Sequence, residues 1–281
     1  MAAPSALSRR AGYRVNAAGI GAFLVVLFWV LMAIFGESLA PYPPGEIVDS
    51  DFFGPMSHAL WLGSDYLGRD VLSRILMGAR YTVGIGFAAT CLAAFGGVIL
   101  GLAAAVIGGW FDMILSRLLD ALSTIPSKLF GLVMVAAVGS SIPILTVLMG
   151  VIYLPGAYRF ARALAVNINT MDFVTVARAR GERTPYLILS EILPNAIGPI
   201  LADFGLRFVF IVLLLSGLSF LGLGVQPPNA DWGSLVHENI GGLPFGAPAV
   251  IFPCLAIATL TIAVNLLIDN LPVKIRDRSE A

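Results

Sequence analysis

Six apolar runs alternate with polar segments along the chain, at about residues 17–35, 81–107, 116–138, 144–165, 196–221 and 249–268. An α-helix rises 1.5 Å per residue, so about 20 apolar residues cross the hydrocarbon core of a bilayer. The pattern therefore predicts six transmembrane helices, which place both ends of the chain on the same side of the membrane.

The first apolar run begins like a signal peptide. Arg9, Arg10 and Arg14 precede it, and Ser38-Leu39-Ala40 resembles a cleavage site. The run is nevertheless longer than the roughly 7–15 apolar residues of a signal peptide, and Pro41 is unfavourable for cleavage. We expect an uncleaved first helix with its basic end in the cytoplasm.

Basic residues are distributed unevenly over the polar segments. Arginines precede the first run, and the segment between the last two runs contains neither lysine nor arginine. The first connecting segment holds Arg69, Arg74 and Arg80 among more numerous acids. Most of the remaining basic residues surround the loop after the fourth run or lie in the C-terminal tail: Arg159, Arg162, Arg178, Arg180, Arg183, Lys274, Arg276 and Arg278. Because cytoplasmic loops carry the excess of basic residues, both termini are expected in the cytoplasm.

Composition agrees with a membrane protein and excludes several classes of function. Of 281 residues, 58% are hydrophobic and 12% are charged, about half the 25% typical of soluble domains. The zero net charge and the lack of a basic block argue against nucleic-acid binding. Cys91 and Cys254 lie in apolar runs, as small core residues do.

Motifs for catalysis or nucleotide binding are missing from the sequence. It has no Walker-type glycine-lysine-serine/threonine stretch, no G-x-S-x-G elbow and only two histidines, His58 and His237, in outer segments. We therefore expect no catalytic residue, metal site or cofactor in this chain.

One compact charged segment interrupts the second half of the chain. It reads ARARGERTPYLILSEILPN, residues 177–195. Residues 175–180 favour a helix that Gly181 interrupts, Thr184-Pro185 can begin another as N-cap and first-turn proline, and Pro194 is expected to end it. A solvated connector is the alternative, but it has no need for the apolar residues between Tyr186 and Leu193. Their presence indicates a docking site.

The segment resembles the cytoplasmic loop of the permease subunits of prokaryotic ABC importers. That loop has the form EAA, three residues, Gly, nine residues, then Ile-x-Leu-Pro. Ala177, Gly181, Leu193 and Pro194 fall on this spacing. The sequence departs from it by having Thr175, Val176 and Glu191 at the Glu, first Ala and Ile positions.

Two further stretches resemble one branch of these permeases. They are HALWLGSDYLGRDVLSRILMGAR, residues 58–80, and GLSFLGLGVQPPNADWG, residues 217–233. Both are similar to signatures of the second permease subunit of the peptide/nickel branch, and the resemblance covers nearly the whole chain. The C-terminal IDNLPVKIRDRSEA departs from the branch's usual Asp-Pro-Lys-Leu-like ending.

The resemblance implies an all-α polytopic protein with the type I ABC importer permease fold, six transmembrane helices and cytoplasmic termini. Residues 1–80 would form the tail, first helix and outer loop, and residues 81–281 a five-helix core with a coupling loop at 172–195. In the family this loop sits in a cleft of the ATPase subunit. The candidate residues of this coupling loop are Ala177, Arg178, Gly181, Glu182, Tyr186, Leu193 and Pro194.

The resemblance also implies the partners and the cargo. Partners are a homologous second permease subunit in a heterodimer, two ATPase subunits that bind ATP and Mg, an extracytoplasmic solute-binding protein, and the lipid of the prokaryotic cytoplasmic (inner) membrane. Peptides or peptide-like solutes are the expected cargo, with nickel chelates, opines and oligosaccharides as alternatives in the branch. A stand-alone secondary transporter or channel is the alternative from another class, but no internal repeat of the kind it would carry is visible.

Several polar residues fall inside the apolar runs, where a charge costs several kcal/mol. They indicate faces directed into a bundle or a wet cavity. Arg117, Asp120, Thr124, Ser127 and Lys128 recur at helical spacing, and Lys128 has no acid within one turn. The candidate translocation-path residues are Asp120, Thr124, Lys128, Asp203, Arg207 and Asn265. Two alternatives remain open: Asp203 and Arg207 can pair with each other, and Arg117 and Asp120 can lie at the inner membrane interface.

Small residues gather at the outer end of the fifth run. Gly217, Gly222 and Gly224 occur in GLSFLGLG. Small residues allow membrane helices to approach closely, and several glycines also loosen a helix. These glycines are candidates for an outer gate, for packing against a partner helix, or for both.

Overall fold

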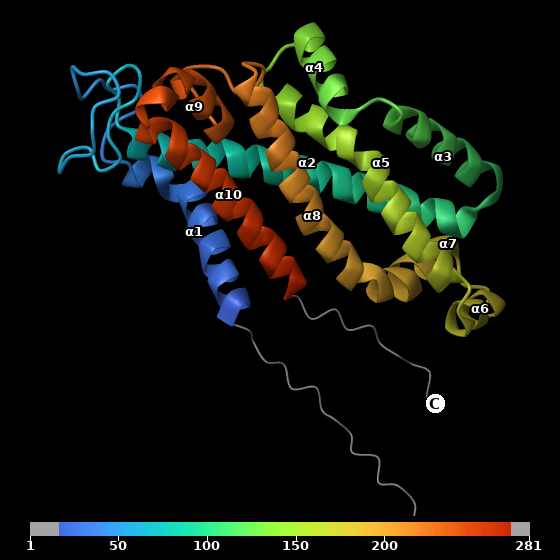
Figure 1. Ribbon diagram of the computed structural model, residues 1–281. Coiled ribbons are helices and arrows are strands. Elements are labelled where there is room, and N and C mark those ends of the chain that lie inside the picture. Colours follow the sequence, from blue (N-terminus) through green and yellow to red (C-terminus); the bar gives the residue numbers. More distant parts are fainter. Residues whose placement is uncertain (1–16, 271–281) are drawn as a thin grey trace, which may run out of the picture.

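The computed structural model describes residues 17–270, and they are almost entirely helical (Figure 1). Within this range extended backbone pairs only in two isolated bridges, between Ile47 and Arg69 and between Ser64 and Asp70. The elements are α1 Ala17–Leu39, α2 Val71–Ile107, α3 Gly109–Ser123, α4 Ser127–Val138, α5 Ile142–Asn169, α6 Asp172–Ala179, α7 Thr184–Tyr186, the π-helical turn η1 Leu187–Ile192, α8 Leu193–Phe220, α9 Trp232–Asn239, the 3-10 turn η2 Ile240–Phe245, and α10 Pro248–Asp269.

Five helices are long and apolar enough to cross a membrane. They are α1, α2, α5, the continuous helix from Thr184 to Phe220, and α10. The predicted third span differs, because α3 and α4 meet at a bend of 82°, and the pair makes a sixth span only when it is counted as one. Pro126 explains the break: it has no N–H to donate, and it disfavours helical backbone at Ile125 before it. Residues 116–138 thus contain two helices at an angle where the sequence predicted one transmembrane helix.

The helices form one bundle around α2 (Figure 1). α5 lies along α2, α1 and α10 pack beside each other, and α8 contacts both groups. The loop before α2 and the short helix α9 lie at one end of the bundle, and α6 and α7 lie at the other. The basic tails used to predict topology, before residue 17 and after residue 270, lie outside the described residues.

The largest differences from the sequence prediction are the start of α2, the helix α9 and the continuation of the helix past Pro194. α2 begins at Val71, ten residues earlier than predicted, because the Asp70 carboxylate accepts a hydrogen bond from the Ser73 N–H at 2.8 Å and caps the helix. The short helix α9 was not predicted. Pro194 does not end its helix, because the preceding turn is a wider π turn and the helix continues to Phe220. Thr184 and Pro185 do begin a helix, with Arg183 at the N-cap.

Small residues bring α2 and α5 into close contact. A Cβ atom at Gly97 would overlap the side chain of Ala157 and lie 2.7 Å from the Tyr158 nitrogen. One turn later, a Cβ at Gly101 would lie 2.7 Å from the Tyr158 carbonyl oxygen. Because lipid tails are as apolar as leucine, such backbone contact is what holds membrane helices together. The pair α2 and α5 therefore forms the closely packed centre of the bundle.

Replacing Gly97 by leucine is expected to separate α2 from α5. Inserting a larger side chain into a packed interface typically costs about 1–3 kcal/mol, so Gly97→Leu should lower both the membrane yield and the apparent Tm of the purified protein. Gly84→Leu is the matched control, since Gly84 is an exposed glycine of the same helix, and a Cβ added to it would meet nothing within 4 Å. Equal Tm values for the two variants would contradict the assigned interface.

Candidate functional site

The charged loop forms a compact unit at one end of the bundle. α6 is followed by Gly181, whose φ of +83° is in the left-handed region that favours glycine, and α7 then begins. Val174 and Ala177 of α6 are buried against Leu187 and Ile192 of η1, in a cluster that also includes residues of α2, α5 and α8. Apolar packing on the bundle therefore holds the loop in place.

The other side of this loop is open. Arg178, Gly181, Glu182, Tyr186 and Pro194 are exposed, whereas Ala177 is buried and Leu193 half-buried. The Arg178 guanidinium donates to the Asn169 side-chain oxygen at 2.9 Å, which ties α6 to the end of α5. The exposed surface also contains apolar side chains, namely Met171, Val176 and Leu189. Exposed apolar groups among charges are typical of a surface that a partner covers.

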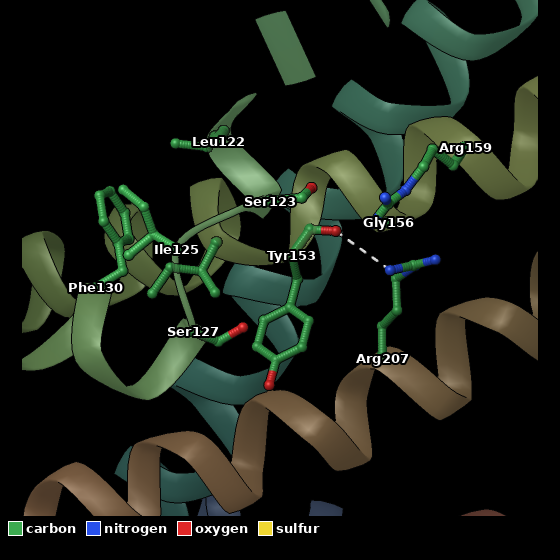
Figure 2. A pocket seen from close by; sticks show the side chains of 10 residues that line it. Leu122, Ser123, Ile125, Ser127, Phe130, Tyr153, Gly156, Arg159 and Arg207 are labelled. Carbon is green, nitrogen blue, oxygen red and sulfur yellow. Dashed lines mark hydrogen bonds between the residues drawn. The ribbon is translucent and has the colours of Figure 1, made fainter. Parts of the chain in front are cut away.

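A cavity of about 220 Å³ lies where α3 and α4 separate, against α5 and α8 (Figure 2). Figure 2 shows Tyr153 between the residues of the α3–α4 break on one side and two arginines on the other. The lining residues are Leu122, Ser123, Ile125, Ser127, Phe130, Ile152, Tyr153, Gly156, Arg159 and Arg207.

Arg207 is held rigidly at the wall of this cavity. Its Nε and Nη2 atoms donate to the two carboxylate oxygens of Asp203 at 2.5 and 2.8 Å, and its Nη1 donates to the Tyr153 carbonyl at 3.2 Å. A Cβ at Gly156 would lie 2.6 Å from Nη1, so glycine is what allows the guanidinium this close to α5. The sequence left open whether Asp203 and Arg207 pair with each other or face a cavity. They form an ion pair, and Arg207 also lines the cavity.

The structure does not gather all of the predicted path residues. Arg207 lines the cavity, and Asp203 is its partner. Thr124 donates to the Ala121 carbonyl next to the lining residues Ser123 and Ile125, and Lys128 is exposed beside Ser127. The predicted polar face along one third helix is wrong, because the 82° bend separates its members. Asn265 lies half-buried on α10, whose residues do not line the cavity, and its role stays a prediction.

Basic residues outnumber acidic ones on the helices around the cavity. α3, α4, α5 and α8 together carry five basic and three acidic side chains. Each acid is paired: Asp112 with Arg162, Asp203 with Arg207, and Asp120 with Arg159 across 3.7 Å. Arg117 and Lys128 have no acid within 4.0 Å among residues 17–270. Two positive charges, one on α3 and one on α4, are thus left without an acidic partner in the described part of the chain.

Tyr153, Gly156 and Arg159 line the cavity but were not predicted to do so from the sequence. Arg159 was used only to predict the topology, and in the structure 56% of its side chain is accessible. Its position a few residues after a proline inside an apolar run could not show which way it points. The fold was needed to bring α5 against the break between α3 and α4.

At the opposite end of the bundle, the first signature stretch contacts α9, the helix that begins at the end of the second stretch. Asp65 and Glu238 pair with both Arg69 and Arg74, at distances of 2.7–3.0 Å. Burial lowers the pKa of Arg69 and the Asp65 carboxylate raises it, with a net rise. Removing any one of these four residues would leave a buried charge without its partner, which is strongly destabilising. The network therefore holds the loop before α2 on α9.

Asp231 and Trp232 anchor the second stretch. The Asp231 carboxylate is fully buried and accepts hydrogen bonds from Ser219 Oγ at 2.8 Å and the Ser234 N–H at 2.9 Å. Burial raises the pKa of this carboxyl, while the hydrogen bonds from Ser219 and Ser234 oppose the rise. The Trp232 indole donates to the Ile75 carbonyl at 2.9 Å. The only signal for this anchor in the sequence was the motif PPNADWG itself.

The three glycines at the outer end of α8 have different surroundings. Gly217 is exposed, and a Cβ added to it would meet nothing within 4 Å, whereas Gly222 has a φ of +79° in the turn that ends the helix. Gly224 packs directly on Ser219, so any side chain there would displace it. Local turn geometry and packing therefore account for Gly222 and Gly224, while Gly217 is free to contact another chain.

Among residues 17–270 no group of histidine, cysteine or acidic side chains is placed to hold a metal ion.

Comparison with known proteins identifies the family. Residues 97–277 match the family described as "Binding-protein-dependent transport system inner membrane component". The chain is similar to the glutathione transport system permease protein GsiD of Pectobacterium atrosepticum, with 34% identity over 90% of this chain and 84% of that protein. It is also 30% identical to the dipeptide transport system permease protein DppC of Alkalihalophilus pseudofirmus, over 91% of this chain and 84% of the relative.

This membership fixes the general role of the chain. A permease component carries no ATPase chemistry and no cofactor of its own, and ATP hydrolysis takes place on separate ATPase subunits. The system includes a solute-binding protein, and the chain is a multi-pass protein of the bacterial inner membrane. The chain belongs to the family of binding-protein-dependent transport system inner membrane components, the permeases of ABC importers.

Proposed function

We propose that this permease translocates peptides or peptide-like solutes that an extracytoplasmic binding protein delivers. The observation that carries the proposal is the cavity at the α3–α4 break, which two arginines line. Relatives named as glutathione and dipeptide permeases support it, since both cargoes are peptides. Nickel chelates, opines and oligosaccharides are the competing cargoes, and an uncharged oligosaccharide would gain little from such a cavity.

The charges around the cavity favour a carboxylate-bearing cargo. Each of the three acids already pairs with an arginine, so a free carboxylate is the group that the surroundings lack. Hydrogen bonds to ionised groups are about twice as strong as neutral ones. In this proposal Asp120 positions Arg159 and Asp203 positions Arg207 for a cargo carboxylate. Thr124 and Lys128 belong to the same path.

A second, homologous permease subunit is proposed to cover α3 and α4. No residue of α3 is buried within this chain, and Arg117 and Lys128 are exposed at the depth of the membrane helices. Facing lipid, such charges would cost several kcal/mol each. A partner subunit, with water in the cavity between the two chains, removes that cost, and Gly217 would contact the same partner.

Transport is proposed to follow from the two ends of the bundle. The loop 172–195 docks in a cleft of an ATPase subunit, and closure of the ATPase dimer on ATP moves it. ATP shifts the permease between inward-open and outward-open states because it binds the closed ATPase dimer more tightly. Residues 37–80 and 224–248, which the network of Asp65, Arg69, Arg74 and Glu238 joins, are the proposed docking surface for the binding protein.

A stand-alone transporter or channel is the second candidate function. It would need its own coupling-ion site between matched halves, and it would leave the exposed surface of α6 and α7 without a purpose. We retain the importer.

Gly181→Trp tests the docking loop. A Cβ at Gly181 would touch nothing within 4 Å, so the loss comes from the left-handed backbone, which costs an ordinary residue roughly 1–2 kcal/mol, and from the bulk added to the docking surface. We expect normal insertion, with loss of ATPase association and of uptake. Gly45→Trp is the matched control for ATPase association alone, since Gly45 has a φ of +80° and equally open surroundings, and it lies in the outer loop. ATPase association that survives in Gly181→Trp would contradict the assignment.

Lys128→Met tests the charge near the cavity. Methionine keeps much of the apolar stem and removes the ammonium group. Uptake of a dipeptide should fall while assembly and basal ATP hydrolysis persist, and Lys128→Arg should restore uptake. Poor assembly of Lys128→Met alone would instead indicate an ion pair with the partner subunit. Unchanged uptake would remove Lys128 from the path.

The topology can be tested by cysteine labelling. Cys91 and Cys254 are first replaced by alanine, since Cys254 is exposed. A cysteine at Phe245, of which 82% is exposed in η2, should react with an impermeant thiol reagent on cells whose outer barrier is opened. A cysteine at the exposed Glu182 should react only after the inner membrane is broken. The reverse pattern would overturn the orientation.

A further inference from the structure

A π-helical turn joins the docking loop to α8. In this turn, η1, the Leu193 N–H donates to the carbonyl of Ile188, five residues earlier, instead of four as in an α-helix. Such turns are rare and often occur at functional sites. The helix from Thr184 to Phe220 thus contains one residue more, in this turn, than an α-helix of the same length would have.

The spacing of the buried residues shows that the sequence requires this turn. Leu187, Ile192, Ala196 and Ile200 are the buried positions here, with exposed fractions of 3%, 0%, 0% and 8%. They are separated by five, four and four residues. At 3.6 residues per turn, a separation of five rotates a side chain by about 140° from its predecessor. Only a wider turn between Leu187 and Ile192 places all four on one face.

Pro194 contributes to the same turn. In an α-helix its ring would collide with the Ser190 carbonyl, four residues earlier, and it has no N–H to donate. The wider turn gives the ring room. The Asn195 side chain then donates to the Glu191 carbonyl at 2.6 Å, which caps the junction of η1 and α8. Pro199 removes a second donor one turn later, inside α8. The ladder is therefore weak on the α8 side of η1.

η1 also contacts several helices at the end of the bundle that carries the docking loop. It packs on α6 and contacts α2 and α5, and Leu187 and Ile192 belong to the buried cluster that holds Val174 and Ala177 of α6. The chain passes from the docking loop to Arg207 through this turn and α8. A movement of the loop reaches the cavity wall along that route.

We propose that η1 is the joint of the permease. When the docking loop moves, the extra residue of this turn shifts along the helix, between the turn that ends at Ile192 and the proline-weakened turn before Pro199. The inference rests on the proposed docking of the loop on an ATPase subunit. Moving the extra residue changes the rotation of the intervening turn while Leu187 stays packed on α6 and α8 stays helical beyond Ile200. Pro194 and Asn195 are thus positioning residues for the transport step.

A variant that lacks the extra residue tests the joint. Deleting Ser190 while keeping Pro194 gives buried spacings of four throughout, so the π turn is no longer needed to place Leu187, Ile192, Ala196 and Ile200 on one face. The loop stays on its face, so ATPase association and basal ATP hydrolysis should persist. Uptake and cargo-stimulated hydrolysis should fall by about tenfold, within the range usual for coupling between sites. Ser190→Ala, at an exposed position, keeps the turn and should transport normally.

Uptake at the native rate in the deletion variant would overturn the joint and leave η1 as packing alone. Loss of ATPase association in Gly181→Trp but full uptake in the deletion variant would separate the two proposals. If the deletion variant does not assemble, amide hydrogen exchange on the native complex decides. The amides of residues 189–198 should exchange at different rates in the nucleotide-free and ATP-trapped states. Equal rates in both states would overturn the proposal.

Discussion

Backbone hydrogen bonding inside the bilayer is the constraint on which the structure depends. No water is present there to satisfy a free N–H or carbonyl, so spanning segments are helical, and irregular backbone survives only where protein or a water-filled cavity covers it. The helix is interrupted at Pro126, between α3 and α4, and the cavity lies at that interruption, as the constraint requires. Backbone hydrogen bonding also departs from the α-helix before Pro194, where a π turn replaces an α turn. The positions that depart from ideal helix are those to which function is assigned.

The same constraint divides the molecule into a fixed part and a movable part. α2 and α5 approach so closely at Gly97 and Gly101 that neither can slide without collision. At the outer end, the buried ionic network adds a second rigid contact, which joins the loop before α2 to α9. α8 differs from these elements, because Pro194 and Pro199 lie near its beginning and Gly217 near its end. In the proposed transport cycle, α8 is therefore the helix that moves against a frame of α2 and α5.

Sequence patterns predicted the helices well and the side-chain contacts poorly, for physical reasons. Hydropathy recovers spans such as 249–268 because burial in lipid requires an unbroken apolar run. It failed at 116–138 because an apolar run has the same hydropathy whether straight or bent. The docking loop was predicted from the apolar residues between Tyr186 and Leu193 in a charged segment, and the helix break expected at Gly181 is present, with a φ of +83°. Arg159 could not be placed, because its direction depends on how α5 packs, a long-range property. The π turn was present in the spacing of Leu187, Ile192 and Ala196, but periodicity alone cannot separate a wide turn from an irregular pattern.

The charge of Arg207 at the cavity depends on how α8 packs against α5. A cation among membrane helices is tolerated only with a partner, and here each acid already has one. Arg207 cannot relax away from the cavity, because Asp203 and the Tyr153 carbonyl hold it from two directions. Its position is therefore fixed by α8 and α5 together. When α8 rotates against α5, the Tyr153 contact must stretch or break, while the Asp203 contact, one turn away on the same helix, moves with it. In the proposed transport cycle, the affinity of the cavity wall for an anionic cargo would therefore depend on the position of α8, as a carrier requires if it is to bind its cargo in one state and release it in the other.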